Sequence, residues 1–495
     1  MYARIALWRV RARRAVDRYC SEAVTTADRV YSALVTRADD EHTDLPSGVR
    51  EQVPRNGLKL VAANTLQSSG DQTVSASTVL PWLFQVLGVP SALVGLLVPI
   101  RESGSMLPQA FLTPLVVRAR HRKWVFVAGA AVQAGAVAVM AAIAALGHGT
   151  AAGVGILAAL TVFSLGRCLC SIASKDVQGR TIPSGERGQI VGLATSAAGL
   201  VAITLGLVIR LAGGEDLSAG QLAVLLAAGA VLWVLSASVY ARVREPAGEG
   251  RDLPSGENED RPSGGERGPG PGDDDDESRS PQAGPEEPSS SWFAEATRLF
   301  RDDPTFRRFI SVRGLLLVSS LSPPFIVTMS VASGTGALAG LGGFIFASGV
   351  ASLIGGRIFG RMADRSSRLL MAGAATAASV VALALVLVVA IPGFDGGSLA
   401  GAAVFVGGYF LLTLLHSGVR VGRKTYVVDV AEGDVRTAYV AVGNTTMGVI
   451  LLVVGGISSA LAALGVQWAL VFLAVLGLVG AASALTMPEV SRGAA

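Results

Sequence analysis

The stretch GLLVPIRESGSMLPQAF, residues 95–111, decides how this chain divides into helices. Arg101 and Glu102 stand side by side among residues that are mostly apolar or small. Either the pair lies inside a membrane helix, or RESGS forms a loop between two helices. The choice sets the number of spans in the first part of the chain and determines whether two charges sit within the bilayer.

The composition is that of a polytopic membrane protein. Of 495 residues, 51% are hydrophobic and 16% are charged, with a mean hydropathy of +0.52, whereas soluble domains carry about 25% charged residues. The net charge of +4 is too small to indicate nucleic-acid binding. Three cysteines, Cys20, Cys168 and Cys170, give neither a disulfide framework nor zinc-ligand spacing. No signal peptide is recognisable, so the first span is expected to direct insertion.

Ten runs are long and apolar enough to cross a bilayer, which takes about 20 residues. They lie at 124–147, 150–172, 188–212, 219–241, 306–332, 337–361, 369–391, 398–419, 438–463 and 466–487. For residues 58–117 two divisions compete: one span near 77–100 with RESGS as a loop, or two spans, 59–87 and 91–117. Hydropathy favours the first division. That division leaves residues 106–117 as a separate apolar segment, which is too short to cross the bilayer.

An internal repeat and the distribution of basic residues both favour two spans. SKDVQGRTIPSGERGQIVG from Ser174 aligns with RKTYVVDVAEGDVRTAYVA from Arg423, which pairs Lys175 with Lys424 and Arg187 with Arg436. Each half then has four spans before this loop. Lysine and arginine fall in alternate loops, and the other loops have none, as the positive-inside rule requires of cytoplasmic loops. We predict an all-α protein of twelve helices in two six-helix bundles, with both termini cytoplasmic.

The chain divides into four regions on this basis. They are a cytoplasmic N-terminal segment (1–57), a first bundle (58–243), an acidic linker (244–292) and a second bundle (293–490). The linker carries 14 acidic residues against 4 arginines between Glu245 and Pro288, so it cannot bury enough apolar surface to fold and is predicted to be disordered. The spacing of apolar and basic residues in the N-terminal segment predicts a basic amphipathic helix, which either lies on the inner leaflet or docks on the bundle. Its apolar face contains Ile5, Trp8, Ala15, Tyr19, Val30 and Leu34.

Motifs for nucleotide or metal chemistry are not found. GVRVGRKT at 418–425 lacks the spacing of a phosphate-binding loop and ends a helix instead of following a strand. The four histidines are scattered without paired spacing, so we expect no metal centre, no cofactor and no enzymatic activity. Transport driven by an ion gradient is the natural class.

Polar residues recur at helical intervals along three spans, which places each set on one face. The first span has Asn64, Gln67, Ser68, Asp71, Ser75 and Thr78, the fourth has Ser164, Arg167, Ser171 and Lys175, and the tenth has Tyr409, Thr413, His416, Arg420 and Arg423. Ionisable groups in hydrocarbon cost several kcal/mol. These faces are therefore predicted to line a water-filled cavity, or to pack on one another.

Asp71, Arg101 and Glu102 form a predicted triad near the middle of the bilayer. Arg101 lies about 15 Å along the axis from Ser91, half of a core roughly 30 Å thick, and Asp71 falls at a similar depth. Adjacent helical residues point about 100° apart, so only one of Arg101 and Glu102 faces Asp71 squarely. The triad is either a protonation switch or a permanent salt bridge that fixes packing. Arg313 on the seventh span either binds an anion or pairs with an acid.

The segment GRIFGRMADRSSR, 356–368, resembles the loop signature of the major facilitator superfamily. That signature is Gly, three residues, Asp-Arg, two residues and Arg, here Gly360, Asp364, Arg365 and Arg368. VPRN at 53–56, VLPWLF at 79–84 and GVRVGRKTYVVD at 418–429 are similar to bacterial permeases of this superfamily. The matching first-half loop, VVRARHRKW at 116–124, lacks the acid, so the second-half copy is expected to carry the conformational latch.

The resemblance implies two bundles rocking about a central site lined by the first, fourth, seventh and tenth helices. It also implies a monomer in a bacterial plasma membrane, with a small-molecule substrate and protons as partners. The acid in the first helix resembles that of proton-coupled exporters, so export is the first expectation. Uptake of a nutrient or organic anion, suggested by Arg101, Arg313 and Arg420, is the alternative. A non-transporting sensor or scaffold that binds partners through the N-terminal helix and the linker is the third.

Overall fold

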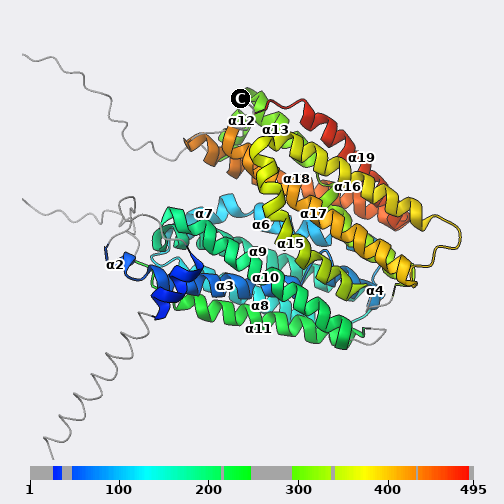
Figure 1. The fold of residues 1–495 in the computed structure, drawn as a ribbon, viewed down its shortest axis with the longest axis horizontal. Coiled ribbons are helices and arrows are strands. Elements are labelled where there is room, and N and C mark those ends of the chain that lie inside the picture. Colours follow the sequence, from blue (N-terminus) through cyan, green and yellow to red (C-terminus); the bar gives the residue numbers. More distant parts are fainter. Residues whose placement is uncertain are drawn as a thin grey trace, which may run out of the picture.

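The computed structural model describes residues 26–35, 47–212, 217–246, 292–335, 340–430 and 433–489. All regular structure in these ranges is helical (Figure 1). The first half contains α2 (Ser47–Arg50), α3 (Val53–Thr73), α4 (Val79–Val86), α5 (Ser91–Val94), α6 (Leu97–Met106), α7 (Gln109–Arg118), α8 (Lys123–Leu146), α9 (Gly149–Thr181), α10 (Ser184–Ala212) and α11 (Ala219–Ala241). The second contains α12 (Trp292–Asp302), α13 (Pro304–Leu315), α14 (Val318–Ala332), α15 (Leu341–Arg365), α16 (Ser367–Val389), α17 (Leu399–Val430), α18 (Gly433–Leu464) and α19 (Val466–Leu485).

Nine helices in the described ranges are long and apolar enough to cross a membrane. They include all the predicted runs except the eighth span, where the apolar helix Leu341–Gly355 is shorter. The remaining two expected spans are helical but interrupted. The first breaks between α3 and α4, at residues 74–78, and the second consists of α5, α6 and α7. The second of these spans breaks between α6 and α7 at Pro108. Proline has no backbone N–H to donate, so it interrupts the hydrogen bonding of a helix.

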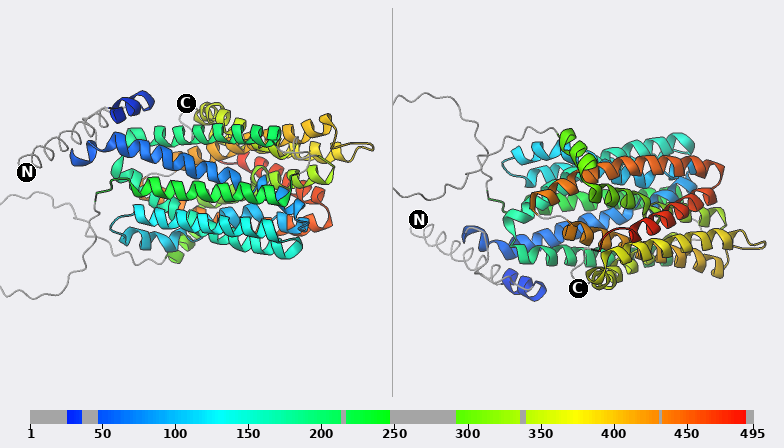
Figure 2. Two further views of the ribbon diagram at one scale, coloured as in Figure 1. Left: turned by 90° about the horizontal axis from the view of Figure 1, so that it is seen from below. Right: turned by 90° about the horizontal axis from the view of Figure 1, so that it is seen from above.

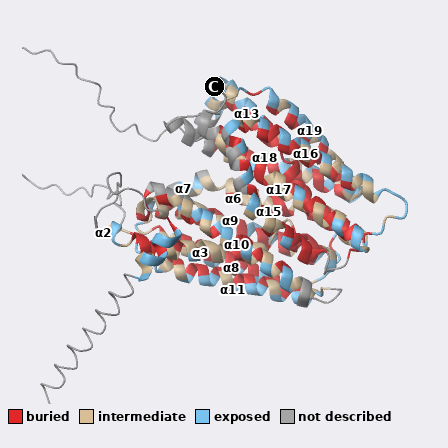
Figure 3. Ribbon diagram, viewed as in Figure 1, coloured by how far each residue is buried: buried red, intermediate tan, exposed pale blue. Residues whose placement is uncertain are grey.

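Arg101 and Glu102 lie inside α6, so the prediction that RESGS is helical is confirmed. The expectation of one continuous helix over 91–117 is wrong, because the chain breaks on either side of α6. Long apolar side chains on peripheral helices point outward, such as Val224 on α11, which is 70% exposed. Figure 3 shows such exposed residues along the outer sides of the bundles. A hydrocarbon environment explains their exposure.

The two halves form separate bundles that meet along two seams. In Figure 1 the blue to green helices α3 to α11 make one bundle, and the light green to red helices α13 to α19 make the other. The first seam packs α5 and α6 against α18, and the second packs α10 against α15. Small residues allow these close approaches: added to Gly455, a Cβ would collide with Pro99, and one on Gly206 would lie 2.7 Å from the Phe346 backbone.

The first seam is closed over most of α5 and α6. Ser91 Oγ donates to the Ala462 carbonyl at 3.0 Å, and Ser103 Oγ to the Gly448 carbonyl at 2.9 Å. Beyond Leu107, which packs on Gly448, the chain continues as α7, which packs mainly on α9 of its own half and keeps a smaller contact with α18. The halves are therefore joined towards the end of the molecule that holds Ser91, and α7 belongs to the opposite end.

Part of the N-terminal segment docks on the first bundle. A helix over residues 26–34 (Figure 2) buries Tyr31 completely, and the Tyr31 hydroxyl donates to the Glu186 carboxylate at 2.6 Å. Val30 and Leu34, predicted on the apolar face, are 44% and 48% exposed, because Tyr31 and Val35 make the contact instead. Ile5, Trp8, Ala15 and Tyr19 lie outside the described residues.

Glu245, assigned to the linker by its sequence, is instead part of the folded bundle. Its carboxylate accepts hydrogen bonds from the backbone N–H groups of Arg122 and Lys123, at 3.2 and 2.9 Å. These groups begin α8, where unpaired N–H groups and the helix dipole favour a negative charge. The linker residues 247–291 lie outside the described ranges, and α12 begins at Trp292.

Candidate functional site

Asp71 of α3 is paired with two arginines from neighbouring helices. Arg101 Nη2 of α6 donates to Asp71 Oδ1 at 2.9 Å. Arg167 Nη1 of α9 lies 2.8 Å from Oδ1 and 2.9 Å from Oδ2. The three side chains are 19%, 12% and 30% exposed, respectively. We call Asp71, Arg101 and Arg167 the Asp71 node. It joins three helices of the first half through charge-assisted hydrogen bonds.

Arg167 is the member that the sequence did not assign to the site. The spacing places it in the polar stripe of the fourth span, which is predicted to line a cavity or to pack on the other stripes, but it does not identify Asp71 as its partner. The close packing of α6 on α9 brings Arg167 to Asp71: a Cβ on Gly104 would lie 2.5 Å from the Ser164 side chain. The sequence did contain one indication that Arg167 belongs to the site: an ionisable group at this depth in the membrane needs a partner.

Of the adjacent pair, Arg101 is the residue that contacts Asp71. The Glu102 carboxylate has no direct hydrogen-bond or ion-pair partner among the described residues. It lies close enough to Arg101, Arg167 and Arg423 for electrostatic interaction with all three. Arg423 belongs to α17 of the second half. Glu102 is thus within electrostatic range of arginines from both halves.

Aromatic side chains enclose one side of the Asp71 node. The guanidinium carbon of Arg101 lies 5.9 Å from the centre of the Phe163 ring, and Phe163 meets Trp233 edge to face at 5.2 Å. A ring face stabilises a nearby cation. Asn64 and Gln67 precede Asp71 on α3 by seven and four residues and are half-buried. They share its face but make no direct contact with the node.

In the described part of the second half, interior cations lack a matching acid. Arg313 of α13 is 9% exposed, and its Nη2 donates to Asn444 Oδ1 of α18 at 3.1 Å. Its Nε is buried without a hydrogen-bond partner among the described residues. Arg423 lies close enough to Arg313 for electrostatic repulsion. Of the two alternatives for Arg313, pairing with an acid is not observed in the described part of the chain.

The polar stripe of the tenth span lies on α17. His416 Nδ1 is 3.3 Å from Ser319 Oγ of α14, Arg420 is exposed, and Tyr409 is 2% exposed. The Tyr409 ring packs at 5.0 Å from Phe344. Beyond the apolar span, burial raises the pKa of Tyr426 to about 12, so this hydroxyl stays neutral.

The predicted gating segment is largely helical. Arg365 ends α15 and is exposed, and Ser366 alone separates it from α16. Arg368 Nη1 donates to the Met487 carbonyl at 2.9 Å, and its Nε lies 3.5 Å from Glu489 Oε2. Both partners are in the second half, so the observed contacts of Arg368 hold the end of α19. Gly360 lies in α15, and the side chain of Asp364 is outside the described part.

The residues of the internal repeat occupy different environments. Arg187 donates to the carbonyls of Gly179 and Ile182, at 2.6 and 2.8 Å, which caps the end of α9. The side chains of Lys424 and Arg436 lie outside the described part of the chain. Lys175 is exposed and lines a cavity of about 410 Å³ between α7 and α9.

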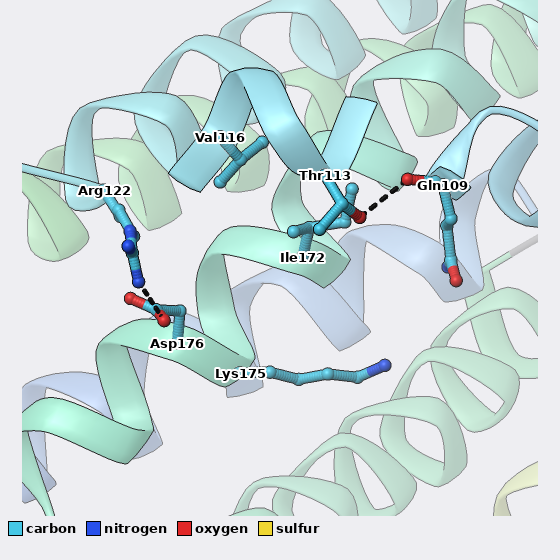
Figure 4. Close-up of a pocket in the computed structure, with 7 residues that line it drawn as sticks. All are labelled: Gln109, Thr113, Val116, Arg122, Ile172, Lys175 and Asp176. Carbon is cyan, nitrogen blue, oxygen red and sulfur yellow. Dashed lines mark hydrogen bonds and ion pairs between the residues drawn. The ribbon is translucent and has the colours of Figure 1, made fainter. Parts of the chain in front are cut away.

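Figure 4 shows this cavity, where the Lys175 side chain extends toward Gln109. Its lining includes Gln109, Thr113, Val116, Arg122, Ile172, Lys175 and Asp176. Arg122 and Asp176 form an ion pair on its wall, and Asp176 also pairs with Arg180 at 2.9 Å. The cavity lies at the α7 end of the first half, away from the hydrogen bonds of Ser91 and Ser103 to α18.

Metal chemistry finds no support in the described ranges, where no group of three His, Cys, Asp or Glu side chains could hold an ion. Cys168 and Cys170 are buried thiols. Cys170 Sγ receives a hydrogen bond from Gln133 Nε2 at 3.2 Å. These cysteines belong to the packing between α8 and α9.

Solved transporter structures share this fold. A variant of the nucleoside transporter NupG matches with a TM-score of 0.60 and 13% identity, over 87% of this chain and 99% of that one. A D-xylose–proton symporter gives 0.62 and 12%, over 88% and 98%. A POT family transporter in complex with 5-aminolevulinic acid gives 0.62 and 11%, over 86% and 95%. At such identities the likeness shows the fold alone.

The sequence itself gives the family. No match is found among curated proteins. Residues 61–400 match the profile described as Major Facilitator Superfamily, which includes the Asp71 node, Glu102, Arg313 and the segment 356–368. The match covers more than half of the chain, and the structural neighbours are transporters of the same fold. The chain therefore belongs to the major facilitator superfamily and is a multi-pass membrane transport protein.

Proposed function

We propose that the protein is a secondary active transporter that moves a small molecule by alternating access and couples this movement to protons through Asp71 and Glu102. The observation that carries the proposal is the Asp71 node. One carboxylate joins α3, α6 and α9 through two guanidinium groups, so its charge decides whether these helices remain tied together. A proton on Asp71 removes that charge and weakens both pairs.

Glu102 supplies the link to the second half in this mechanism. When Asp71 is protonated, Arg101 and Arg167 lose their main counter-charge, and Glu102 is the next carboxylate within their electrostatic range. Glu102 also acts on Arg423 across the seam. Competition of these arginines for Glu102 would transmit the protonation state of Asp71 to α17. A permanent salt bridge would instead leave the node unchanged during transport.

The seams support an assignment of conformational state. The halves are joined by the contacts of Ser91 and Ser103, and the cavity lined by Lys175 and Asp176 lies at the α7 end. The basic loops also lie at that end, and such loops face the cytoplasm under the positive-inside rule. We assign this arrangement to the inward-facing state of a transporter in a bacterial inner membrane.

Export in exchange for protons is the direction we propose first, because the acid of the first span lies in the interior and is paired with two arginines. Uptake of an organic anion is the second candidate, and it is favoured because Arg313 has no acidic partner among the residues that the structure describes. Comparing solute levels in cells with and without the gene distinguishes them. Expression lowers the internal level of an exported solute and raises that of an imported one.

Proton coupling is tested in proteoliposomes that contain a trapped pH-sensitive dye. Addition of the solute found in cells should move protons across the membrane in wild type, and Asp71→Asn should abolish this flux. Asp302→Asn is the matched control, because Asp302 is exposed on α12. A solute that is transported equally with and without a pH gradient, or an Asp71→Asn variant with wild-type flux, refutes the coupling proposal.

A further inference from the structure

The described charges of the interior do not balance between the two halves. Asp71 faces both Arg101 and Arg167, while Glu102 lies near Arg101, Arg167 and Arg423. Adding Arg313 gives four buried or partly buried arginines and two carboxylates, an excess of two positive charges, and the exposed Arg420 adds a further cation within electrostatic range of Arg423. Burial of an unpaired charge is costly. The excess is located at Arg313 and Arg423, because the first-half arginines already have Asp71.

Arg313 offers unused hydrogen-bond donors at this position. It is 9% exposed, and its single described partner is the neutral oxygen of Asn444 at 3.1 Å. Its Nε is buried with no acceptor. The Asn444 amide nitrogen also has no acceptor among the described residues. A guanidinium fork beside an amide N–H₂ matches the oxygens of a carboxylate or a phosphate.

Arg423 adds a second cation on the opposite helix. It lies on the polar face of α17, and it has no direct hydrogen-bond or ion-pair partner among the described residues. Electrostatic interaction with Arg313 is repulsive, whereas the interaction with Glu102 is attractive. Two like charges held near each other inside a protein are stabilised by an anion bound between them.

We propose that Arg313, Asn444 and Arg423 bind an anionic oxygen group, a carboxylate or a phosphate, of the transported solute. The proposal rests on the proposed transport function and names the chemical class of its substrate. Glu102 lies within electrostatic range of Arg423, so it competes with the solute for that arginine. Binding of the solute then releases Glu102 toward Arg101 and Arg167, which couples the anion site to the Asp71 node.

Thermal unfolding of the purified full-length protein in neutral detergent tests the site directly. Intrinsic tryptophan fluorescence is followed while succinate, citrate or inorganic phosphate is titrated at constant ionic strength with chloride. D-xylose serves as the uncharged control. At least one anion should raise Tm saturably, and comparison of the three separates a carboxylate from a phosphate. Xylose should have no effect.

Variants then locate the binding site. Arg313→Gln should weaken the apparent affinity for the active anion by at least about tenfold, the scale of a charge-assisted hydrogen bond. Arg423→Gln and Asn444→Ala should weaken it as well. Arg308→Gln, an exposed arginine on the same helix, should bind as wild type does. Size-exclusion profiles verify folding, and Arg423→Gln and Asn444→Ala provide the same test if Arg313→Gln does not fold.

The proposal is overturned if none of the three anions shifts Tm saturably, or if the shift survives in Arg313→Gln and disappears in Arg101→Gln. The outcome is separable from that of the proposed function. Anion binding lost in Arg313→Gln, without any transport in proteoliposomes, keeps the site and refutes the transporter. Proton-driven movement of a neutral solute without anion binding keeps the transporter and refutes the site.

Discussion

The interior arginines of the two halves differ in their partners. In the first half Arg101 and Arg167 share Asp71 at 2.8 to 2.9 Å. In the second half Arg313 has only the neutral side chain of Asn444 at 3.1 Å among the described residues. The two bundles have similar helix arrangements, so the fold does not impose this difference. It agrees with the proposed division of labour, in which the first half switches charge and the second half binds an anion.

Glu102 connects the two environments. It belongs to α6 of the first half but acts on Arg423 of α17, beside the point where Ser103 bonds to Gly448 of α18. If the charges of each half interacted only within that half, no residue would have the position of Glu102. The following changes either remove the difference between the halves or separate the two regions.

Asp71→Ala should have the largest effect, because it leaves the interior arginines of the first half without an acidic partner, as Arg313 is among the described residues of the second half. Two guanidinium groups lose their shared acid, and breaking a buried pair costs about 3 kcal/mol or more. We expect a large fall in Tm and loss of proton-driven transport. Asp302→Ala, at an exposed position, is the control. Unchanged Tm in Asp71→Ala would mean that the node contributes no stability.

Gly455→Val should come next, because it separates the halves where they meet. A side chain at 455 collides with Pro99 of α6, and overpacking costs about 1–3 kcal/mol. Moving α6 also moves Glu102 away from Arg423. Transport should fall by about tenfold, which corresponds to 1.4 kcal/mol, and Ser459→Cys should react faster with a thiol reagent in this background.

Gly456→Val is the matched control for that change. Its added side chain meets no atom within 4 Å, so transport and labelling should stay at the wild-type level. Equal effects at positions 455 and 456 would show that the close approach to Pro99 is irrelevant.

Arg313→Gln and Arg167→Gln should change stability in opposite directions. Glutamine at 313 removes a buried charge without an acid partner and should stabilise the protein by about 1 kcal/mol. Glutamine at 167 removes a partner of Asp71 and should destabilise it. Paired unfolding curves in detergent, without added anions, measure both. A fall in Tm for both variants would show that Arg313 has a counter-charge.

Arg368→Gln should have the smallest effect. Its contacts with Met487 and Glu489 lie within the second half, and partly exposed contacts of this kind contribute about 1 kcal/mol or less. We expect slightly lower Tm and near-normal transport rates in proteoliposomes. A large loss of transport with unchanged Tm would support the gating role that the family signature suggests.

The sequence predicted the helical architecture well, because span length and hydropathy are local properties. It also placed Asp71 and Arg101 at the same depth. It missed Arg167 as the second partner, since the rotation of α9 depends on the packing of Gly104 against Ser164. It missed the break at Pro108 and the role of Glu245 as the cap of α8. The docking of Tyr31 on Glu186 joins residues 155 positions apart, and local patterns carry no information on such contacts.

The central claim is that the first half couples protons and the second half binds the solute. The most direct measurement compares two assays in proteoliposomes with the solute identified in cells: exchange without a gradient, and accumulation driven by a pH gradient. Asp71→Asn should retain exchange and lose accumulation, whereas Arg313→Gln should lose both. Accumulation at the wild-type level in Asp71→Asn, or exchange at the wild-type level in Arg313→Gln, would contradict the account.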